Sequence, residues 1–213
     1  MSLLDENKFK IGSAISQKDI DDIIFRCGDT LELGLGNGKM NLVLFFYVCE
    51  LCFKTEAYGL LADDLLNDIY EEIGRKSILG LSEICGIGCG VEFLIQCGLV
   101  EGDSDVILAE LDMKIMEQIP FVINDNVLLG KYEEYVCYIL CRLLSPRDRQ
   151  NTFYPFDKDY LDGITKFILR EHCENRKGFF SLFISYMNGY DVIFDWNDVL
   201  TKSCLLNKYR ITI

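Results

Sequence analysis

The sequence contains one histidine, at position 172, among its 213 residues. A nucleophilic mechanism that pairs Cys or Ser with His would therefore have to use His172. Its neighbours are Arg170, Glu171 and Glu174, which indicate a solvated helix end and not a buried base. We therefore expect His172 to lie at a helix C-terminus, where a cationic side chain interacts favourably with the helix dipole.

Long apolar segments are also lacking. A helix that crosses a bilayer needs about 20 predominantly apolar residues, and the longest apolar runs, such as Leu42–Cys49, are far shorter. The first residues, MSLLDENKFK, contain no basic region followed by an apolar stretch and a small-residue cleavage site. We therefore expect a cytoplasmic protein with no membrane partner.

Basic residues are scarce relative to acidic ones. The chain has 21 Lys and Arg against 34 Asp and Glu, which gives a formal net charge of −13. This deficit argues against nucleic acid as a partner, because sequence-independent affinity for phosphate comes from Lys and Arg. An anionic membrane surface is disfavoured for the same reason. A basic peptide is electrostatically the easiest partner, although solubility explains the acidic balance equally well.

Cysteine, in contrast, is abundant, with ten residues. The cysteines lie mostly inside apolar helical runs, and not at the spaced loop positions of a small secreted scaffold. Cys49 and Cys52 have C-x-x-C spacing, but no second pair completes a four-ligand zinc site beside them. We expect the cysteines to be reduced and to behave as small buried apolar residues.

Hydrophobic periodicity predicts two alternating kinds of helix. Residues 61–73 carry apolar side chains at four-residue spacing and acidic side chains on the other face, which is typical of an amphipathic surface helix. Residues 42–53 have almost no polar face; a strand is possible there on propensity alone, but the length favours a buried helix. The same couplet recurs at 91–97 with 105–119, at 135–144 with 158–170, and at 179–187 with 196–206.

Polar residues mark where several of these helices begin. Asp103 or Ser104 is predicted to cap the helix at 105–119, and Asp195 the helix at 196–206, because their side-chain oxygens accept orphan backbone N–H groups. A further short helix is predicted near the N-terminus, at 18–27. The sequence thus predicts an all-α protein with an inner layer of apolar helices and an outer layer of amphipathic ones.

Glycines precede or begin each apolar helix, and we interpret them as turns that lead into helices. Glycine suits such turns because it adopts positive φ and permits close backbone approach. Gly38, Gly86, Gly130 and Gly178 recur every 44 to 48 residues, a period typical of stacked or circular helical hairpins. We therefore predict one repeat domain over 1–213, with units at about 30–77, 78–120, 121–174 and 175–213. The turn residues are Gly36, Gly38, Gly86, Gly88, Gly90, Gly130 and Gly178.

The stretch ILGLSEICGIGCGVEFLIQCGLVEGDSDVILAELDMKIMEQI (78–119) resembles a repeat of lanthionine synthetase C-like (LanC-like) proteins, whose Gly-rich turns lead into inner helices. LELGLGNGKMNLVLFFYVCEL (31–51) is similar to the preceding repeat of that family, and LLGKYEEYVCYILCRLL (128–144) to the following one. The resemblance covers about residues 30–170. It implies a partial, open α/α toroid of about four pairs of inner and outer helices.

The resemblance does not extend to the family's zinc chemistry. LanC-like enzymes close thioether rings with a zinc ion held by two Cys and one His, in motifs of the W-C-Y-G and C-H-G kind. Here Trp196 is followed by Asn197, and no Cys directly precedes a His. We therefore expect no metal, no cofactor and no catalysis. The resemblance implies instead a protein that binds a peptide or a partner enzyme in a lantibiotic-like maturation pathway.

Two alternatives stay open. A zinc-dependent lanthionine cyclase-type enzyme with atypical ligands would draw on Cys85, Cys89, His172 and Cys173. A HEAT-like structural scaffold has a similar repeat length. The segment GLGNGK (34–39) invites a phosphate-loop interpretation but lacks the Ser or Thr after the Lys. An open arc of repeats leaves apolar end faces, so we also expect docking onto a partner or a homo-oligomer through such a face.

Overall fold

The structure is a computed structural model that describes residues 9–11, 15–76, 79–117, 129–146, 154–171 and 178–212. Helices make up most of these residues. Their one sheet is a two-stranded antiparallel pair, in which β1 (Lys10–Ile11) joins β2 (Ile211–Thr212). The all-α prediction is therefore confirmed. No helix in the described ranges is long and apolar enough to cross a membrane.

The chain folds as two compact units. Unit 1 combines Met1–Glu101 with Asp195–Ile213, and unit 2 consists of Gly102–Phe194. The boundaries fall inside the second and fourth predicted repeat units, 78–120 and 175–213, so the compact units do not follow the predicted repeats. The physical reason for the second boundary is that the C-terminal residues pack on α2 and pair with β1 in unit 1.

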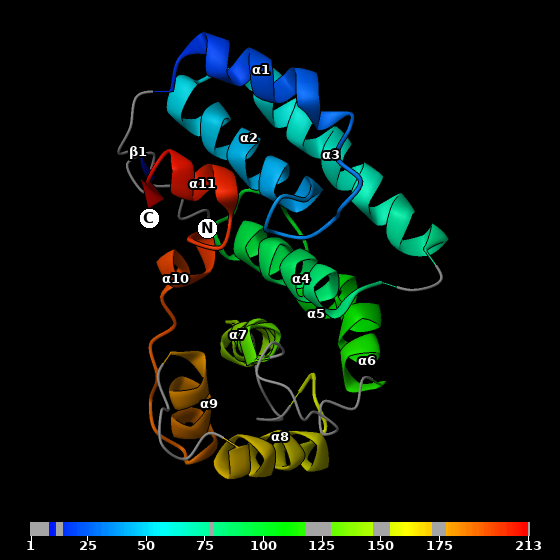
Figure 1. Cartoon of the computed structure of the whole chain (residues 1–213), viewed down its shortest axis with the longest axis vertical. Helices are drawn as coiled ribbons and strands as arrows, with labels where there is room; N and C mark the ends of the chain where they lie inside the picture. The colour runs from blue at the N-terminus through cyan, green and yellow to red at the C-terminus, as the bar shows by residue number, and fades with distance from the viewer. Residues whose placement is uncertain are drawn as a thin grey trace. The chain divides into compact units, whose positions relative to one another are not determined.

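Unit 1 is built around a helical hairpin. Its helices are α1 (Gln17–Cys27), α2 (Lys39–Phe53), α3 (Glu56–Arg75), α4 (Leu81–Gln96), α10 (Trp196–Leu200) and α11 (Cys204–Lys208) (Figure 1). Every residue of α2 from Lys39 to Cys49 is buried, whereas α3 buries one stripe and exposes the rest. The predicted couplet of a buried helix and an amphipathic helix is confirmed here, with α3 starting five residues before the predicted Leu61.

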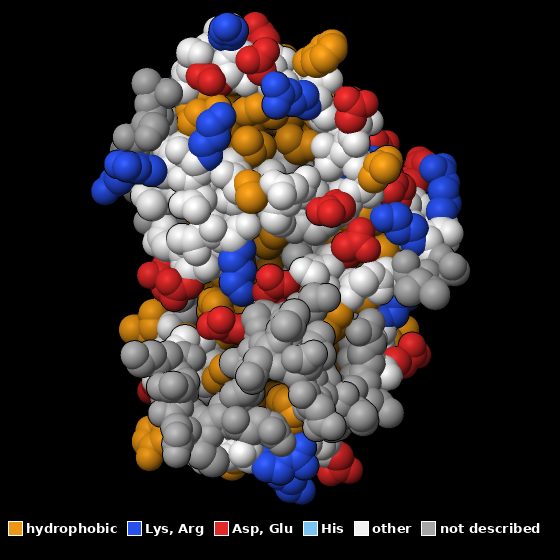
Figure 2. Space-filling view, viewed as in Figure 1, with side chains coloured by type: hydrophobic (Ala, Val, Ile, Leu, Met, Phe, Trp, Pro, Cys, Tyr) orange, Lys and Arg blue, Asp and Glu red, His pale blue; other side chains and the backbone are white. Residues whose placement is uncertain are grey.

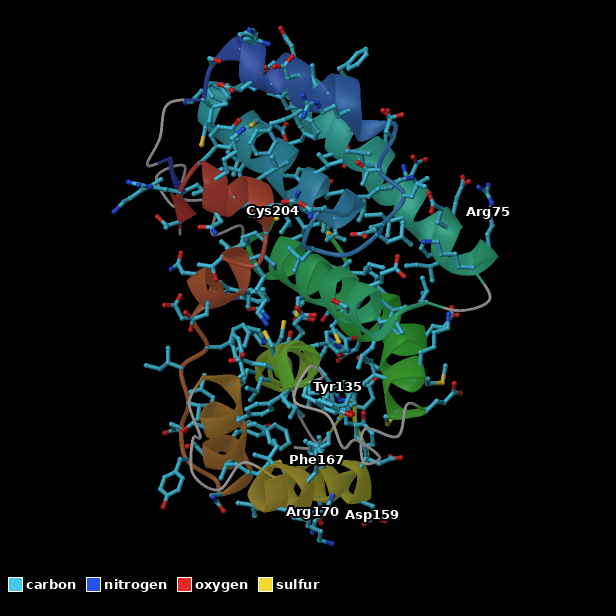
Figure 3. All side chains as sticks on the ribbon, viewed as in Figure 1. Arg75, Tyr135, Asp159, Phe167, Arg170 and Cys204 are labelled. Atoms are coloured by element: carbon cyan, nitrogen blue, oxygen red, sulfur yellow. The ribbon has the colours of Figure 1, made fainter. Side chains whose placement is uncertain are left out.

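Unit 2 contains α5 (Ser104–Ile107), α6 (Ala109–Glu117), α7 (Leu129–Leu144), α8 (Lys158–Glu171) and α9 (Phe179–Met187). Aromatic side chains connect α7 to α8. The ring centroids of Tyr132 on α7 and Phe167 on α8 are 5.2 Å apart, and the hydroxyls of Tyr135 on α7 and Tyr160 on α8 are hydrogen-bonded to each other. Figure 3 shows Tyr135 and Phe167 directed into the space between these helices, while Asp159 and Arg170 lie on the side of α8 that faces away from α7. The third predicted couplet is therefore a packed pair.

Two predicted helices are each divided in two. The predicted helix at 105–119 becomes α5 and α6 within the described residues, and the one at 196–206 becomes α10 and α11. The second break has a local cause, because the Ser203 side chain accepts the backbone N–H of Leu206 and starts a new helix. The predicted caps are confirmed: Asp103 accepts the N–H of Asp105, and Asp195 accepts that of Asn197.

The seven glycines predicted to form turns occupy three kinds of position. Gly38 and Gly178 are the residues that immediately precede α2 and α9, and Gly36 lies in the bend just before α2, as predicted. The prediction is wrong for Gly86, Gly88 and Gly90, which lie in the middle of α4, a helix that begins directly after Gly80. Gly130 lies in the first turn of α7.

Close packing explains the glycines inside α4. A Cβ on Gly86 would lie 2.5 Å from the backbone nitrogen of Leu35, and one on Gly90 would lie 2.3 Å from Cγ of Met40. The residues just before and at the start of α2 therefore pack directly on the α4 backbone. Tertiary packing overrides the low helix propensity of glycine here.

Candidate functional site

Cys85 and Cys89 lie one turn apart on α4, and both are buried. A zinc ion requires three or four donors around it. Across the residues that the structure describes, no three His, Cys, Asp or Glu side chains are grouped closely enough to hold a metal ion. The other two candidate ligands, His172 and Cys173, lie outside the described residues. The zinc alternative therefore stays a prediction about Cys85 and Cys89 with partners that the structure does not place.

At the end of the GLGNGK segment, the backbone N–H and the side-chain ammonium of Lys39 both have partners within the chain. The backbone N–H groups of Lys39 and Met40 donate to the carbonyls of Glu32 and Leu33. Nζ of Lys39 lies 2.5 Å from Oε1 of Glu72 and 3.3 Å from Oδ2 of Asp68. A phosphate loop offers its Lys to the ligand, whereas Lys39 is held by two carboxylates of α3 and so has a structural role.

Burial of Lys39 alone would lower the pKa of its ammonium. The hydrogen bonds to Glu72 and Asp68 outweigh the cost of burial and raise the pKa of Lys39 above its ordinary value. The ammonium therefore stays charged at neutral pH and fixes the start of α2 to the C-terminal half of α3. It is not a free base.

Unit 2 has its own buried ion pair. Nη2 of Arg142, on α7, donates to Oδ2 of Asp112 on α6 at 2.8 Å and to Oδ1 of Asp105 on α5 at 3.0 Å. The hydroxyl of Tyr138 donates to Oδ1 of Asp112 at 2.6 Å, and Nη1 of Arg142 donates to Oγ of Ser104. A fully buried guanidinium needs such partners to offset its desolvation. The cluster joins α5, α6 and α7, which is a structural role.

Carboxylates gather where α2 ends and α3 begins. The hydroxyl of Tyr47 on α2 donates a short hydrogen bond to Oδ1 of Asp63 on α3. The carboxylate of Glu50, one turn further along α2, lies directly against Gly59 of α3, where a Cβ would come within 2.3 Å of Oε2. Gly59 thus leaves room for Glu50 to lie against α3, near the carboxylates of Asp63 and Glu56.

Two ionisable groups at this end of the hairpin have raised pKa values. Burial, followed by the negative charges of Asp63 and Glu56, raises the pKa of Glu50 above its usual 4.5. Burial and the hydrogen bond to Asp63 likewise raise the pKa of Tyr47. Glu50, Glu56, Asp63 and Asp64 have no ion-pair partner in the described part of the chain. Within the described residues, no ion pair with Lys or Arg therefore offsets these four carboxylates.

The other acidic residues on the C-terminal half of α3 differ in this respect. Asp68 and Glu72 pair with Lys39, and Glu71 pairs with Arg75 at 2.6 Å. Arg75 extends from the end of α3 in Figure 3. Among the described acidic residues of α3, those without a Lys or Arg partner at ion-pair distance therefore lie in its N-terminal half.

The sequence predicts that the acidic side chains of residues 61–73 lie on the solvent side of a surface helix, and it predicts no role for Leu60. The spacing could have indicated that Leu60 is exposed. Leu60 does not belong to the apolar stripe of Leu61, Leu65 and Ile69, and it follows Glu56 by four residues, which places it on the acidic side of the helix. The closeness of Glu50 to Gly59 had no such signal, since it depends on how α2 and α3 pack together.

Comparison with known proteins identifies no relatives: the chain matches no protein-family model, and neither a curated protein nor a solved structure shows a significant match to it.

Proposed function

We propose that this chain is a non-catalytic helical-repeat protein of the LanC-like kind that binds a peptide or a partner enzyme in a peptide-maturation pathway. The observation that supports binding most directly is the exposure of large apolar side chains in unit 1. Phe25 on α1 is 86% exposed, Leu31 after it 80%, and Tyr70 on α3 77%. Figure 2 also shows hydrophobic side chains at the surface over α1 and α2, between Lys and Arg side chains. Large exposed apolar side chains such as these provide surface that a protein partner can bury.

The buried charges also favour a binding role over catalysis. Lys39 is held by Asp68 and Glu72, and Arg142 by Asp112 and Asp105. A catalytic acid or base needs to reach a substrate, whereas these groups are engaged in joining helices. Their roles are those of a scaffold that presents a surface.

The partial α/α toroid is part of the same proposal. It is supported within unit 1 by the pairing of fully buried α2 with amphipathic α3, and within unit 2 by the packing of α7 on α8. Such pairs are the building blocks of both circular and open arrays of helical hairpins. Small-angle X-ray scattering of the full chain tests this part, since a partial toroid predicts a curved particle and a HEAT-like scaffold an elongated one.

The functional test uses a synthetic peptide that carries one Cys and one dehydroalanine. A LanC-type cyclase adds the thiol S–H across the dehydroalanine double bond, so the free thiol disappears. We expect calorimetry to detect binding, and alkylation with mass spectrometry to find the thiol intact with or without added Zn²⁺. Zinc-dependent loss of the thiol would overturn the proposal in favour of the enzyme alternative.

A further inference from the structure

The chain between α9 and α10 runs as an extended stretch that belongs to no helix or strand. Residues 190–195 form no helix, strand, turn or bend, and Figure 1 shows them as a plain ribbon that leads from α9 to α10. Both ends of the stretch are anchored. Asn188, Gly189 and Tyr190 donate their backbone N–H groups to carbonyls in the last turns of α9, and Asp195 caps the start of α10.

Side chains in this stretch alternate as those of a half-buried strand do. Val192 and Phe194 are half-buried, and the Phe194 ring packs on that of Phe179 on α9, with centroids 5.9 Å apart. Asp191 and Ile193, at the alternate positions, are exposed, Ile193 to 88%. A period of two with one side packed is the pattern of a β-strand, and β-branched and aromatic residues such as these favour strands.

The backbone of this strand-like stretch has no partner strand. Among the residues that the structure describes, none makes a hydrogen bond with the backbone of Asp191, Val192 or Ile193. Unpaired N–H and C=O groups along an exposed, extended segment are a template on which another strand can pair. In such pairing the main-chain hydrogen bonds give affinity, and the alternating side chains give specificity.

The local charge indicates which strand fits. Residues 188–201 contain three Asp and no Lys or Arg, and Asp191 has no ion-pair partner in the described part of the chain. A partner strand with Lys or Arg opposite Asp191 and an apolar residue opposite Ile193 is complementary to this side of the stretch. A second copy of the chain, which has a net charge of −13, would instead be repelled.

We infer that residues 190–194 bind an extended peptide by β-strand addition, and that this peptide carries Lys or Arg and an apolar residue at two-residue spacing. The inference rests on the proposed binding function and specifies the conformation and the charge of the bound peptide. Tyr190, 68% exposed at the start of the segment, provides further apolar surface for it.

The test measures binding of three synthetic peptides to the full chain by fluorescence anisotropy. The first, Lys-Thr-Ile-Thr-Lys, has Lys and Ile at two-residue spacing, and the second has Glu in place of both Lys. The third is the first with every backbone amide N-methylated, which keeps the side chains and removes the strand donors. We expect the first to bind, with an affinity that falls as salt rises, the second not to bind, and the third to bind at least about tenfold more weakly, as the loss of about two hydrogen bonds predicts.

Hydrogen exchange with mass spectrometry locates the bound peptide. Amides without hydrogen bonds exchange fast, so those of residues 191–193 should exchange rapidly in the free chain and slowly with the Lys peptide bound. Protection gained only elsewhere would overturn the inference. Slow exchange of these amides in the free chain, together with a dimer in light scattering, would show that a second copy occupies the segment and would also overturn it.

A proline variant tests the same hydrogen bonds from the side of the chain. Ile193→Pro removes an N–H that a partner strand needs but that no other described residue uses. It should weaken binding of the Lys peptide about five- to tenfold, whereas the matched variant Ile193→Val, which keeps the N–H and a branched side chain, should stay within about twofold. Circular dichroism with thermal melting checks that both variants remain folded.

Failure of the inference and failure of the proposed function give different results. Equal affinity of the N-methylated and unmodified peptides for the unaltered chain would contradict strand addition, even if Ile193→Pro does not fold. Absence of Lys-peptide binding at low salt would also overturn the inference. None of these outcomes involves the Cys and dehydroalanine peptide, whose zinc-dependent loss of thiol is what overturns the proposed function.

Discussion

At the scale of single residues, Glu50 links stability to pH. Its pKa is raised by burial first and by the charges of Asp63 and Glu56 next. A raised pKa means that the folded chain binds the Glu50 proton more tightly than the unfolded chain does. The free energy of unfolding therefore falls as pH rises from about 4.5 through the raised pKa, and Glu50 is destabilising at neutral pH.

Glu50→Gln is accordingly expected to raise the thermal midpoint at neutral pH, by about 1–2 °C. The gain should shrink as the pH is lowered and vanish below about pH 4, where the wild-type carboxyl is also neutral. Differential scanning calorimetry across this range measures both effects. Glu101→Gln removes a charge from an exposed site and serves as the control. A gain that is independent of pH would contradict this account of Glu50.

Cysteine reactivity is a second prediction at the residue scale. Burial, with a smaller effect of Cys52, raises the pKa of the Cys49 thiol to about 12. Burial also raises the pKa of Cys52, but the side chains of Cys52 and Cys204 are exposed to solvent, whereas that of Cys49 is buried. The thiolate is the reactive species, so native Cys49 should resist maleimide while Cys52 and Cys204 are labelled. Peptide mass spectrometry after brief labelling distinguishes them, and denaturant should make Cys49 reactive. Rapid native labelling of Cys49 would show that α2 is not buried as described.

At the scale of elements, we predict that replacing a glycine of α4 by alanine destabilises the chain, although helix propensity alone would predict the opposite. Alanine normally stabilises a helix over glycine, by about 0.5–1 kcal/mol. At Gly86, however, the new Cβ would lie 2.5 Å from the backbone of Leu35 and 3.0 Å from that of Gly34. Because backbone cannot swing aside as a side chain can, Gly86→Ala should destabilise the chain by about 1–3 kcal/mol.

Gly74 on α3 is the matched control for Gly86. It is also helical, but a Cβ there would meet nothing within 4 Å. Gly74→Ala should therefore stabilise the chain, by about 0.5–1 kcal/mol. Urea denaturation of the two variants measures both signs. If both substitutions stabilise the chain, α4 does not pack against residues 34–35 as closely as described.

The helices differ in how much of each can be predicted from the sequence. Periodicity predicted the bounds of α9 as 179–187, as observed, and those of α8 to within one residue, because their apolar stripes are regular. The start of α4 was mispredicted because Gly86, Gly88 and Gly90 are typical of a turn in isolation. Their role depends on Leu35 and Met40, which lie some fifty residues earlier in the chain. The partners of Lys39 and the position of Glu50 against Gly59 likewise arise only when helices pack.

At the scale of the whole molecule, unit 1 requires both ends of the chain. Asn41 is buried on α2, and its side-chain oxygen accepts the hydroxyl of Ser203 at 2.5 Å and the N–H of Leu205 at 3.1 Å. The Tyr209 ring packs against Phe45 at 5.6 Å between centroids, and β2 pairs with β1. Residues 195–213 therefore cover part of α2, although all of unit 2 separates them from it in sequence.

Removal of residues 195–213 should consequently destabilise unit 1 more than unit 2. It exposes Phe45 and leaves Asn41 without its partners, and a buried polar group left unsatisfied costs about 1–3 kcal/mol. Hydrogen exchange with mass spectrometry should show protection lost in α2 and largely kept in α7. Asn41→Ala, a milder change, should reduce α2 protection in the same direction. Equal loss of protection in α2 and α7 would mean that the two units unfold as one, and unchanged protection of α2 would mean that the C-terminal residues do not stabilise it.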